Sequence, residues 1–555
     1  MNKKEKILAF ISLAIACFLT VLDGTIVNVS LPTMANYFNT NITGISWVST
    51  AYLIPFSALL INFSKIADIY GRKKLFLIGL IVFGGSSICC GLSTSLPMII
   101  SFRIIQGIGA AILTPLAIPL AIELFGKSAM SKLAIIIGMI ISISAASGPV
   151  IGGILNEAFG FKAIFYVNIP FILISLILGG KYVRECYDKT IEKKVDLIGS
   201  VFLAYGLGAL TFFLVKGSDY GWGSAKIITL IITSIASIIV FMIYEKTVKN
   251  PMIEFNIFKT KSFTASIILI AVIFFAYMPI SYLMNFYLEN QLGYSVLKAG
   301  LILGITSATS FVMAPVFSII TKKTSPKLTS IFSIVFVTLG DLTFVFMNNT
   351  NSMKIIYVAV IIVGIGIGAI TPLYQTAFEE ISLDKNGMAS GILNSLRQLA
   401  ACIAIALVAT LSSHYTTVAI SNTKDQIINK VNASTVLKPE IKTTINSKIR
   451  TSNNSSQAGF SKETVKNLFE KQEKIVLSNT PYKARPLVIK EFSAQQSEVY
   501  NIVNEGKIIK DNESNKVYNK CFLIIGIIAI FGLIAVPFNS KKEQDISKAD
   551  SEVIV

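Results

Sequence analysis

Fourteen long apolar runs dominate the sequence and set its class of fold. Each is close to the roughly 20 residues that a helix needs to cross the hydrocarbon core of a bilayer. Backbone polar groups in lipid have no water to bond with, so each run is expected to be a helix. The sequence therefore predicts an all-α integral membrane protein. The runs begin near Ile7, Ile45, Leu75, Met98, Leu133, Ala163, Leu197, Ile227, Phe263, Ala299, Leu328, Ile355, Gly387 and Cys521.

The amino-acid composition excludes most classes of soluble protein. The chain has 555 residues, of which 53% are hydrophobic and 14% charged, whereas soluble domains carry about 25% charged residues. The net charge of +18 would suggest nucleic acid in a soluble protein, but here the basic residues lie mainly in loops between apolar runs. We therefore expect no nucleic-acid partner. The six cysteines show no metal-ligand spacing, so neither a metal site nor a disulfide framework is expected.

The basic residues predict the orientation in the membrane. With the N-terminus on the cytoplasmic side, the cytoplasmic tails and loops hold 25 Lys and Arg, and the short loops on the other side hold 5. Short cytoplasmic loops are enriched in Lys and Arg. Both termini are therefore predicted to be cytoplasmic, in a multi-pass protein of a bacterial cell membrane.

An internal repeat predicts two similar halves. Residues 107–116 and 364–373 are identical at six of ten positions. Their helices are eight apart and run in the same direction, as in transporters built from two parallel six-helix halves. Eight is six plus two, so two helices are predicted to be inserted between the halves. Arg103 in the first copy's helix aligns with Val360 in the second, so the halves share packing but not charge.

These patterns divide the chain into six parts. Residues 414–520 carry 17 basic and 10 acidic residues and are predicted to form an extracellular segment, for which a helical extension of the flanking spans, a disordered loop and a partner-binding domain all stay open. Within this segment, the composition of two stretches favours helices: Lys462–Leu477 and Leu487–Val503. The predicted parts are 1–185 (six-helix N-terminal half), 186–255 (two inserted helices), 256–413 (most of the C-terminal half), 414–520, 521–539 (last span) and 540–555 (cytoplasmic tail).

Charged residues inside the spans are candidate functional groups, because a charge at the bilayer centre costs about 2.5–3.5 kcal/mol. Asp23 lies about 24 Å along its helix and Arg103 about 8 Å into a helix of opposite direction, so both reach a similar depth. We expect them to pair or to compete for a shared proton site. Asp341, Arg397 and Gln106 are candidates for binding substrate or for charge pairs.

Four stretches carry family signatures. They are LDGTIVNVSLP at 22–32, SKIADIYGRKK at 64–74, RIIQGIGAA at 103–111 and SGPVIGG at 147–153. Together they resemble the major facilitator superfamily, and most closely its fourteen-helix drug:proton antiporters of the EmrB/QacA type. The resemblance covers residues 5–413 and the last span, but not 414–520.

The resemblance implies roles for two of these stretches. In the 64–74 loop, Asp68, Gly71 and Arg72 would form a gating loop, with Asp68 latching the halves against a helix N-terminus near Asn386 and Gly387. In 147–153, an antiporter motif would let the halves rock without leaking; its residues are Gly148, Pro149, Gly152 and Gly153.

The resulting prediction is a proton-coupled multidrug efflux transporter that exports hydrophobic or cationic small molecules by alternating access. Asp23 would be the proton-responsive carboxylate and Arg103 its modulator. No cofactor is expected, and the proton gradient would be the energy source. We expect a transporter rather than an enzyme, and we expect it to act as a monomer. The alternative is an exporter or flippase of a lipid or cell-envelope precursor, with an envelope or accessory partner for 414–520. A receptor with a degenerate transporter body and a nutrient importer are further alternatives.

Overall fold

The computed structural model is helical throughout the residues that it describes. These are 2–126, 129–187, 196–248, 251, 253–348, 352–381, 385–451, 469–470, 473–474, 476–478 and 481–539. Among them, 14 helices are long and apolar enough to cross a membrane. The predicted all-α class and the number of spans are therefore confirmed.

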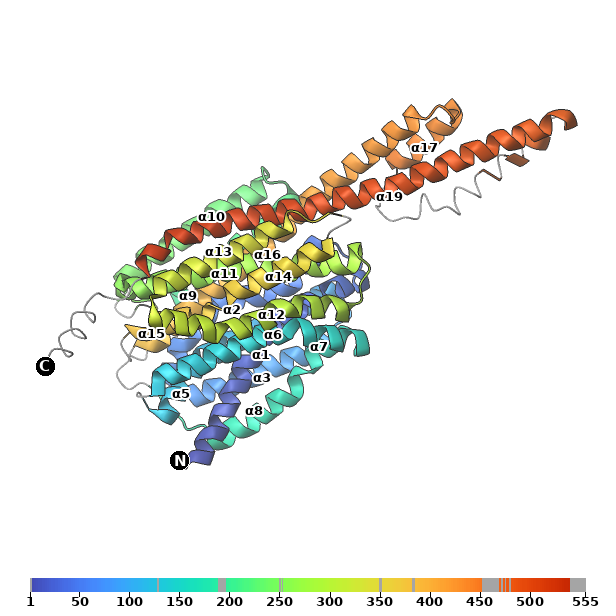
Figure 1. Cartoon of the computed structure of the whole chain (residues 1–555). Coiled ribbons are helices and arrows are strands. Elements are labelled where there is room, and N and C mark those ends of the chain that lie inside the picture. The colour runs from blue at the N-terminus through green and yellow to red at the C-terminus, as the bar shows by residue number, and fades with distance from the viewer. Residues whose placement is uncertain are drawn as a thin grey trace. The chain divides into compact units, whose positions relative to one another are not determined.

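The helices follow the predicted apolar runs in chain order (Figure 1). The first half of the chain contains α1 (Lys3–Tyr37), α2 (Ile42–Tyr70), α3 (Arg72–Leu92), α4 (Leu96–Leu113), α5 (Ala117–Phe125), α6 (Met130–Phe159), α7 (Ala163–Tyr166), α8 (Asn168–Tyr182), α9 (Leu197–Tyr220) and α10 (Ala225–Thr247). The second contains α11 (Lys261–Phe286), α12 (Val296–Lys323), α13 (Pro326–Phe344), α14 (Ser352–Ile367), α15 (Ile370–Glu379), α16 (Asn386–Ala433), α17 (Pro439–Thr451) and α19 (Arg485–Ile530).

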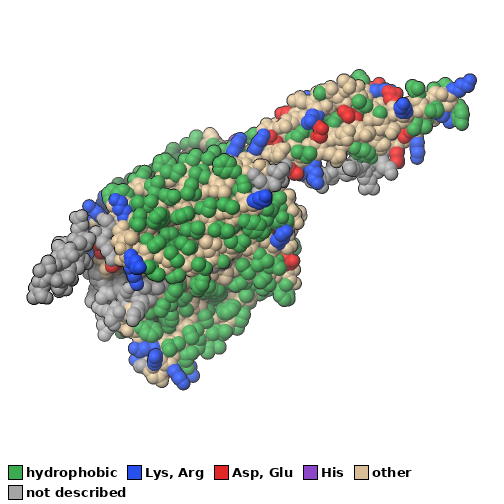
Figure 2. Space-filling view, in the orientation of Figure 1, with side chains coloured by type: hydrophobic (Ala, Val, Ile, Leu, Met, Phe, Trp, Pro, Cys, Tyr) green, Lys and Arg blue, Asp and Glu red, His purple; other side chains and the backbone are tan. Residues whose placement is uncertain are grey.

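The chain forms two compact units. Unit 1 comprises Met1–Phe346, Met353–Leu411 and Cys521–Val555, and unit 2 comprises Met347–Ser352 and Ser412–Lys520. The visible surface of unit 1 is covered with hydrophobic side chains, and its basic residues gather toward its ends (Figure 2). Ile81, Ile177 and Ile243 are all at least 60% exposed. Such a surface suits contact with lipid rather than water.

The repeat is visible in how the two halves of unit 1 pack. A Cβ atom placed on Gly107 would lie 2.2 Å from the backbone oxygen of Tyr52, on α2. A Cβ on Gly364 would lie 2.4 Å from the backbone oxygen of Thr306, on α12. Glycine is needed at both positions, because these helices touch backbone to backbone.

The second repeat glycine shows the same correspondence. A Cβ on Gly109 would lie 2.7 Å from the backbone nitrogen of Phe83 on α3, and one on Gly366 would lie 2.8 Å from the backbone oxygen of Ser333 on α13. Helices α2 and α3 are the second and third spans, whereas α12 and α13 are the tenth and eleventh. The offset of eight spans is therefore the same in the packing as in the sequence.

Helices α6 and α12 form a seam between the two halves. A Cβ on Gly300 of α12 would lie 2.2 Å from the backbone oxygen of Pro149, and one on Gly153 of α6 would lie 3.0 Å from that of Val296. On another side of α6, a Cβ on Gly148 would lie 2.1 Å from the hydroxyl oxygen of Thr25 on α1. The seam therefore depends on backbone contact along α6.

Unit 2 is an antiparallel helical hairpin. Its core consists of Ile428, Val431, Leu437, Ile445, Ile449, Phe469, Val499 and Ile502. A hydrogen bond and an ion pair link α16 to α19: Asn422 donates to Glu513 at 3.3 Å, and Lys430 pairs with Glu505 at 2.5 Å. The segment between the last two spans is thus helical where it is described, and α16 and α19 extend beyond membrane length. Most of Lys462–Leu477 lies outside the described residues.

Candidate functional site

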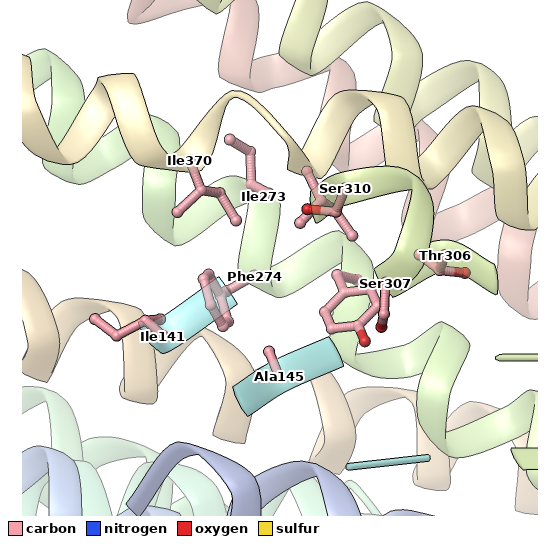
Figure 3. Close-up of a pocket in the computed structure, with 10 residues that line it drawn as sticks. Ile141, Ala145, Ile273, Phe274, Thr306, Ser307, Ser310 and Ile370 are labelled. Carbon is pink, nitrogen blue, oxygen red and sulfur yellow. The ribbon is translucent and has the colours of Figure 1, made fainter. Parts of the chain in front are cut away.

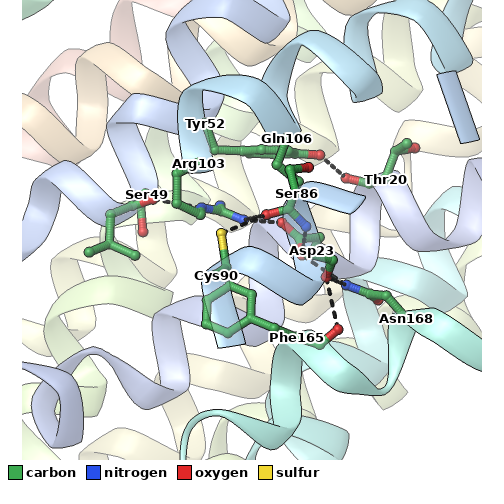
Figure 4. A network of polar contacts seen from close by, with 12 residues as sticks. Thr20, Asp23, Ser49, Tyr52, Ser86, Cys90, Arg103, Gln106, Phe165 and Asn168 are labelled. Atoms are coloured by element: carbon green, nitrogen blue, oxygen red, sulfur yellow. Dashed lines mark hydrogen bonds and ion pairs between the residues drawn. The ribbon is translucent and has the colours of Figure 1, made fainter. Parts of the chain in front are cut away.

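An ion pair buried in unit 1 joins the first span to the fourth. Asp23 on α1 and Arg103 on α4 are both 0% exposed, and Arg103 Nη1 donates to Asp23 Oδ2 (Figure 4). Gln106, one turn further along α4, donates from Nε2 to Asp23 Oδ1 at 2.9 Å and accepts from Arg103 Nη1 at 2.9 Å. The structure therefore brings together Asp23 and Arg103, which sequence reasoning placed at similar depth, and adds Gln106, which the sequence offered as a charge-pair candidate.

Helix α2 holds the guanidinium of Arg103 from the other side. Arg103 Nε donates to the backbone oxygen of Val48 at 2.8 Å, and its carbon Cζ lies 4.2 Å from the centre of the Tyr52 ring. The Tyr52 hydroxyl in turn donates to the backbone oxygen of Thr20 at 2.7 Å. Arg103 Nη2 has no hydrogen-bond partner among the described residues.

Asn168, at the start of α8, is a member of the site that the sequence did not indicate. Its Nδ2 donates to Asp23 Oδ1 at 3.2 Å and to Ser87 Oγ at 3.0 Å. Ser87, on α3, donates to the backbone oxygen of Phe165 at 2.8 Å. The only available signal was an amide in the middle of an apolar run, which stands out far less than a charge does.

The chemistry of the site follows from this donor set. A buried carboxylate stays ionised only if a cation and hydrogen-bond donors replace its water. Asp23 has an arginine and two amides. Taking up a proton would remove its negative charge and leave Arg103 without a counter-ion, so protonation of Asp23 and the position of Arg103 are coupled. This is the property that a proton-driven carrier requires.

The loop between α2 and α3 is built around Gly71, whose φ of 116° is one that glycine adopts readily. Asp68 pairs with Arg72 at 2.7 Å. The Glu185 carboxylate accepts from the backbone nitrogens of Lys73 and Lys74 at 2.9 and 3.1 Å, and so caps the first turn of α3.

The segment after α8 completes this loop. Arg72 donates from its backbone nitrogen to the oxygen of Cys186 at 2.9 Å. Burial raises the pKa of the Cys186 thiol, and the neighbouring Arg72 guanidinium opposes that rise. The expected latch between Asp68 and the start of α16 is not tested, because the side chains of Asn386 and Gly387 lie outside the described residues.

A second helix cap crosses the seam between the halves. Glu157, near the end of α6, accepts from the backbone nitrogen of Leu297 at 2.9 Å, in the first turn of α12. Carboxylates are stabilised at helix N-termini by about 0.3–1 kcal/mol. The contact therefore fastens one end of the seam.

We expect Glu157→Gln to raise, by a few-fold, the share of molecules in which the two halves are separated at this end. The substitution removes the charge that stabilises the helix N-terminus while keeping the shape of the side chain. Double electron–electron resonance between spin labels at Phe159 and Asn290 would show a larger share of long distances. Glu5→Gln is the matched control, because it removes a helix-capping carboxylate within one half, away from the seam. An unchanged distance distribution in Glu157→Gln would mean that this contact does not hold the seam.

Asp341 and Arg397 lie apart from this network. Both are 0% exposed. The Asp341 oxygens and the Arg397 guanidinium nitrogens have no hydrogen-bond partner among the described residues, and no ion pair between the two is found there. Asp341 lies against α19, where a Cβ on Gly526 would be 3.5 Å from the Asp341 Cβ.

A small cavity lies between α6 and the C-terminal half (Figure 3). It has a largely apolar lining with a few hydroxyl groups, which suits a hydrophobic ligand. The lining residues are Ile141, Ala145, Ile273, Phe274, Tyr277, Thr306, Ser307, Ser310, Ile367 and Ile370.

Known proteins resemble this chain in sequence and in fold. The model of the Major Facilitator Superfamily matches residues 13–405. The multidrug resistance protein Stp of Mycobacterium tuberculosis is 29% identical over 419 residues, covering 74% of this chain and 76% of Stp. The riboflavin transporter RibZ of Clostridioides difficile is 29% identical over 71% of this chain and 86% of its own length.

The multidrug export protein EmrB of Escherichia coli is 28% identical over 56% of this chain and 61% of its own length. Among solved structures, a bacterial homologue of the human lysosomal transporter Spinster, in an inward-facing and occupied conformation, matches with a TM-score of 0.56 at 13% identity. That match covers 98% of this chain and 100% of the other, and shows the shared fold alone.

The family match spans most of the chain, and the fourteen helices and the repeat packing agree with it. The resemblance drawn from the four motifs is thus confirmed, and the chain is a transporter rather than an enzyme. This multi-pass membrane protein belongs to the Major Facilitator Superfamily, among relatives that include the EmrB-type multidrug exporters.

Proposed function

We propose that the protein exports hydrophobic small molecules, cations among them, in exchange for protons. The observation that carries the proposal is the buried Asp23, whose charge is balanced by Arg103 and supported by Gln106 and Asn168. Curated relatives named as multidrug resistance or export proteins support the same function. Binding would occur between the halves, near the membrane midplane, as in other transporters built from repeats.

The proton gradient supplies enough energy for this work. A membrane potential of about 150 mV provides roughly 3.5 kcal/mol per proton. At about 1.4 kcal/mol per tenfold, one proton can support a substrate gradient of a few hundred-fold. The proposed setting is the bacterial cell membrane, with both termini in the cytoplasm and a monomer as the working form.

The direct test is substrate-induced proton release in proteoliposomes across a panel of lipophilic cations and antibiotics. Proton release that depends on the substrate, together with uptake driven by an imposed pH gradient, is the expected result. A folded protein that gives neither signal for any compound would contradict drug export and make lipid transport the next assay.

Shortening unit 2 separates drug export from export of a lipid or envelope precursor. The hydrogen bond between Asn422 and Glu513 shows where α16 and α19 can be rejoined, so a short flexible linker would replace residues 424–511. We expect the shortened protein to keep most of its drug transport in proteoliposomes, because the Asp23 network lies wholly in unit 1. Loss of drug transport by a well-folded shortened protein would favour export of an envelope precursor.

A further inference from the structure

Arg397 is a buried cation without a counter-ion. It lies on α16 and is 0% exposed. None of its three guanidinium nitrogens has the geometry of a full hydrogen bond within the described part of the chain, and the polar group near enough to interact with it is the Tyr374 hydroxyl. Buried charges in proteins are paired, because removing a charge from water is costly unless an opposite charge replaces the solvent. Among the described residues, Arg397 therefore lacks the negatively charged partner that its position demands.

Its surroundings are aromatic. The carbon Cζ of Arg397 lies 5.0 Å from the centre of the Phe274 ring on α11. Its charge also acts on the hydroxyls of Tyr374, on α15, and Tyr52, on α2, and on the thiol of Cys17, on α1. Residues from both halves of the transporter therefore lie within reach of its charge.

No carboxylate of unit 1 fills the gap among the residues that the structure describes. The Asp23 carboxylate is already bound by Arg103, Gln106 and Asn168. The Tyr374 hydroxyl, the polar group beside Arg397, donates to Asn394 at 3.3 Å. The missing anion must therefore come from outside the described chain.

The cavity between the halves and Arg397 share one neighbour, Phe274. Phe274 belongs to the cavity lining (Figure 3) and is also the ring beside Arg397. A guanidinium is a planar fork that binds a carboxylate or another oxyanion through two parallel hydrogen bonds. Aromatic walls favour a flat apolar body. The two features together describe a ligand with an aromatic core and one oxyanion group.

We propose that Arg397 binds the oxyanion of a transported substrate, so that the cargo includes hydrophobic molecules bearing a carboxylate, sulfonate or phosphate. The flat part of the molecule lies against Phe274 and Tyr374, and its anionic group bonds to Arg397. This inference rests on the proposed export function and extends it beyond neutral and cationic compounds.

The test compares the free carboxylate of a rhodamine dye with its methyl ester in proteoliposomes. We expect the wild type to transport both dyes. Arg397→Gln should lower transport of the acid by about tenfold or more, as expected for loss of charge-assisted hydrogen bonds, and leave the ester within about twofold. Arg397→Lys should fall between, because lysine keeps the charge but not the fork. Arg184→Gln, which removes an exposed arginine, is the matched control.

Several results would overturn the proposal. Equal losses for acid and ester in Arg397→Gln would assign Arg397 a purely structural role. A wild type that exports other compounds but not the acid would contradict the oxyanion site while leaving export intact. A wild type that exports nothing would contradict the proposed function itself. Should Arg397→Gln not fold, competition in the wild type decides: naphthoate must inhibit ester export more strongly than naphthamide does.

Discussion

Asp23→Asn should abolish substrate-driven proton release, because the amide keeps nearly the size of the carboxylate but cannot take up a proton in exchange. The variant also leaves Arg103 buried without its counter-ion, and breaking a buried pair in this way typically costs about 3–5 kcal/mol. We therefore expect lower thermal stability together with loss of coupling. Fluorescence of a pH-sensitive dye in proteoliposomes measures the coupling.

A double variant separates the two effects. Asp23→Asn with Arg103→Gln removes both charges, and replacing a buried pair by neutral groups is often close to neutral in stability. Its melting temperature should recover toward that of the wild type while proton release stays absent. Proton release that persists in a stable Asp23→Asn protein would show that another group carries the proton.

Gly107→Ala and Gly364→Ala should both destabilise the protein, because the new methyl group would meet a backbone oxygen of the neighbouring helix at 2.2 and 2.4 Å. Overpacking of this kind costs about 1–3 kcal/mol. A lower melting temperature in detergent, followed by fluorescence-detected size-exclusion chromatography, is the expected result for both variants.

Gly85→Ala is the control for these two substitutions. Gly85 is also helical, but a Cβ placed there has no atom within 4 Å, and alanine favours a helix over glycine by about 1 kcal/mol. It should leave stability unchanged or raise it slightly. If only one repeat glycine proves sensitive, the packing of the two halves is not equivalent.

The membrane spans could be predicted because lipid leaves the backbone few alternatives, but their ends could not. The apolar run near Ile7 belongs to a helix that begins at Lys3, where Asn2 and Glu5 form a capping box. The apolar run near Cys521 is only the last part of α19, which begins at Arg485. Hydropathy marks the part of a helix that suits lipid, whereas capping and hairpin packing decide where the helix ends.

The site was partly predictable for a similar reason. Charges inside apolar runs are conspicuous, and depth along antiparallel helices paired Asp23 with Arg103. Asn168 carries no charge, and its role depends on the packing of α8 beside α1 and α3. No local sequence pattern indicates that packing. The surroundings of Arg397 come from helices far apart in the chain, so the missing counter-ion is visible only in three dimensions.

The seam between α6 and α12 has a consequence for inhibitor design. Where Gly300 meets the backbone of Pro149, the two helices leave no space for even a methyl group, so a drug-like blocker cannot wedge between them there. Ile141 and Ala145 of α6 and Ser307 of α12 line the cavity further along the same helices. A blocker that filled this cavity would stop the two halves from moving against each other, and it would not have to enter the tightly packed glycine contacts.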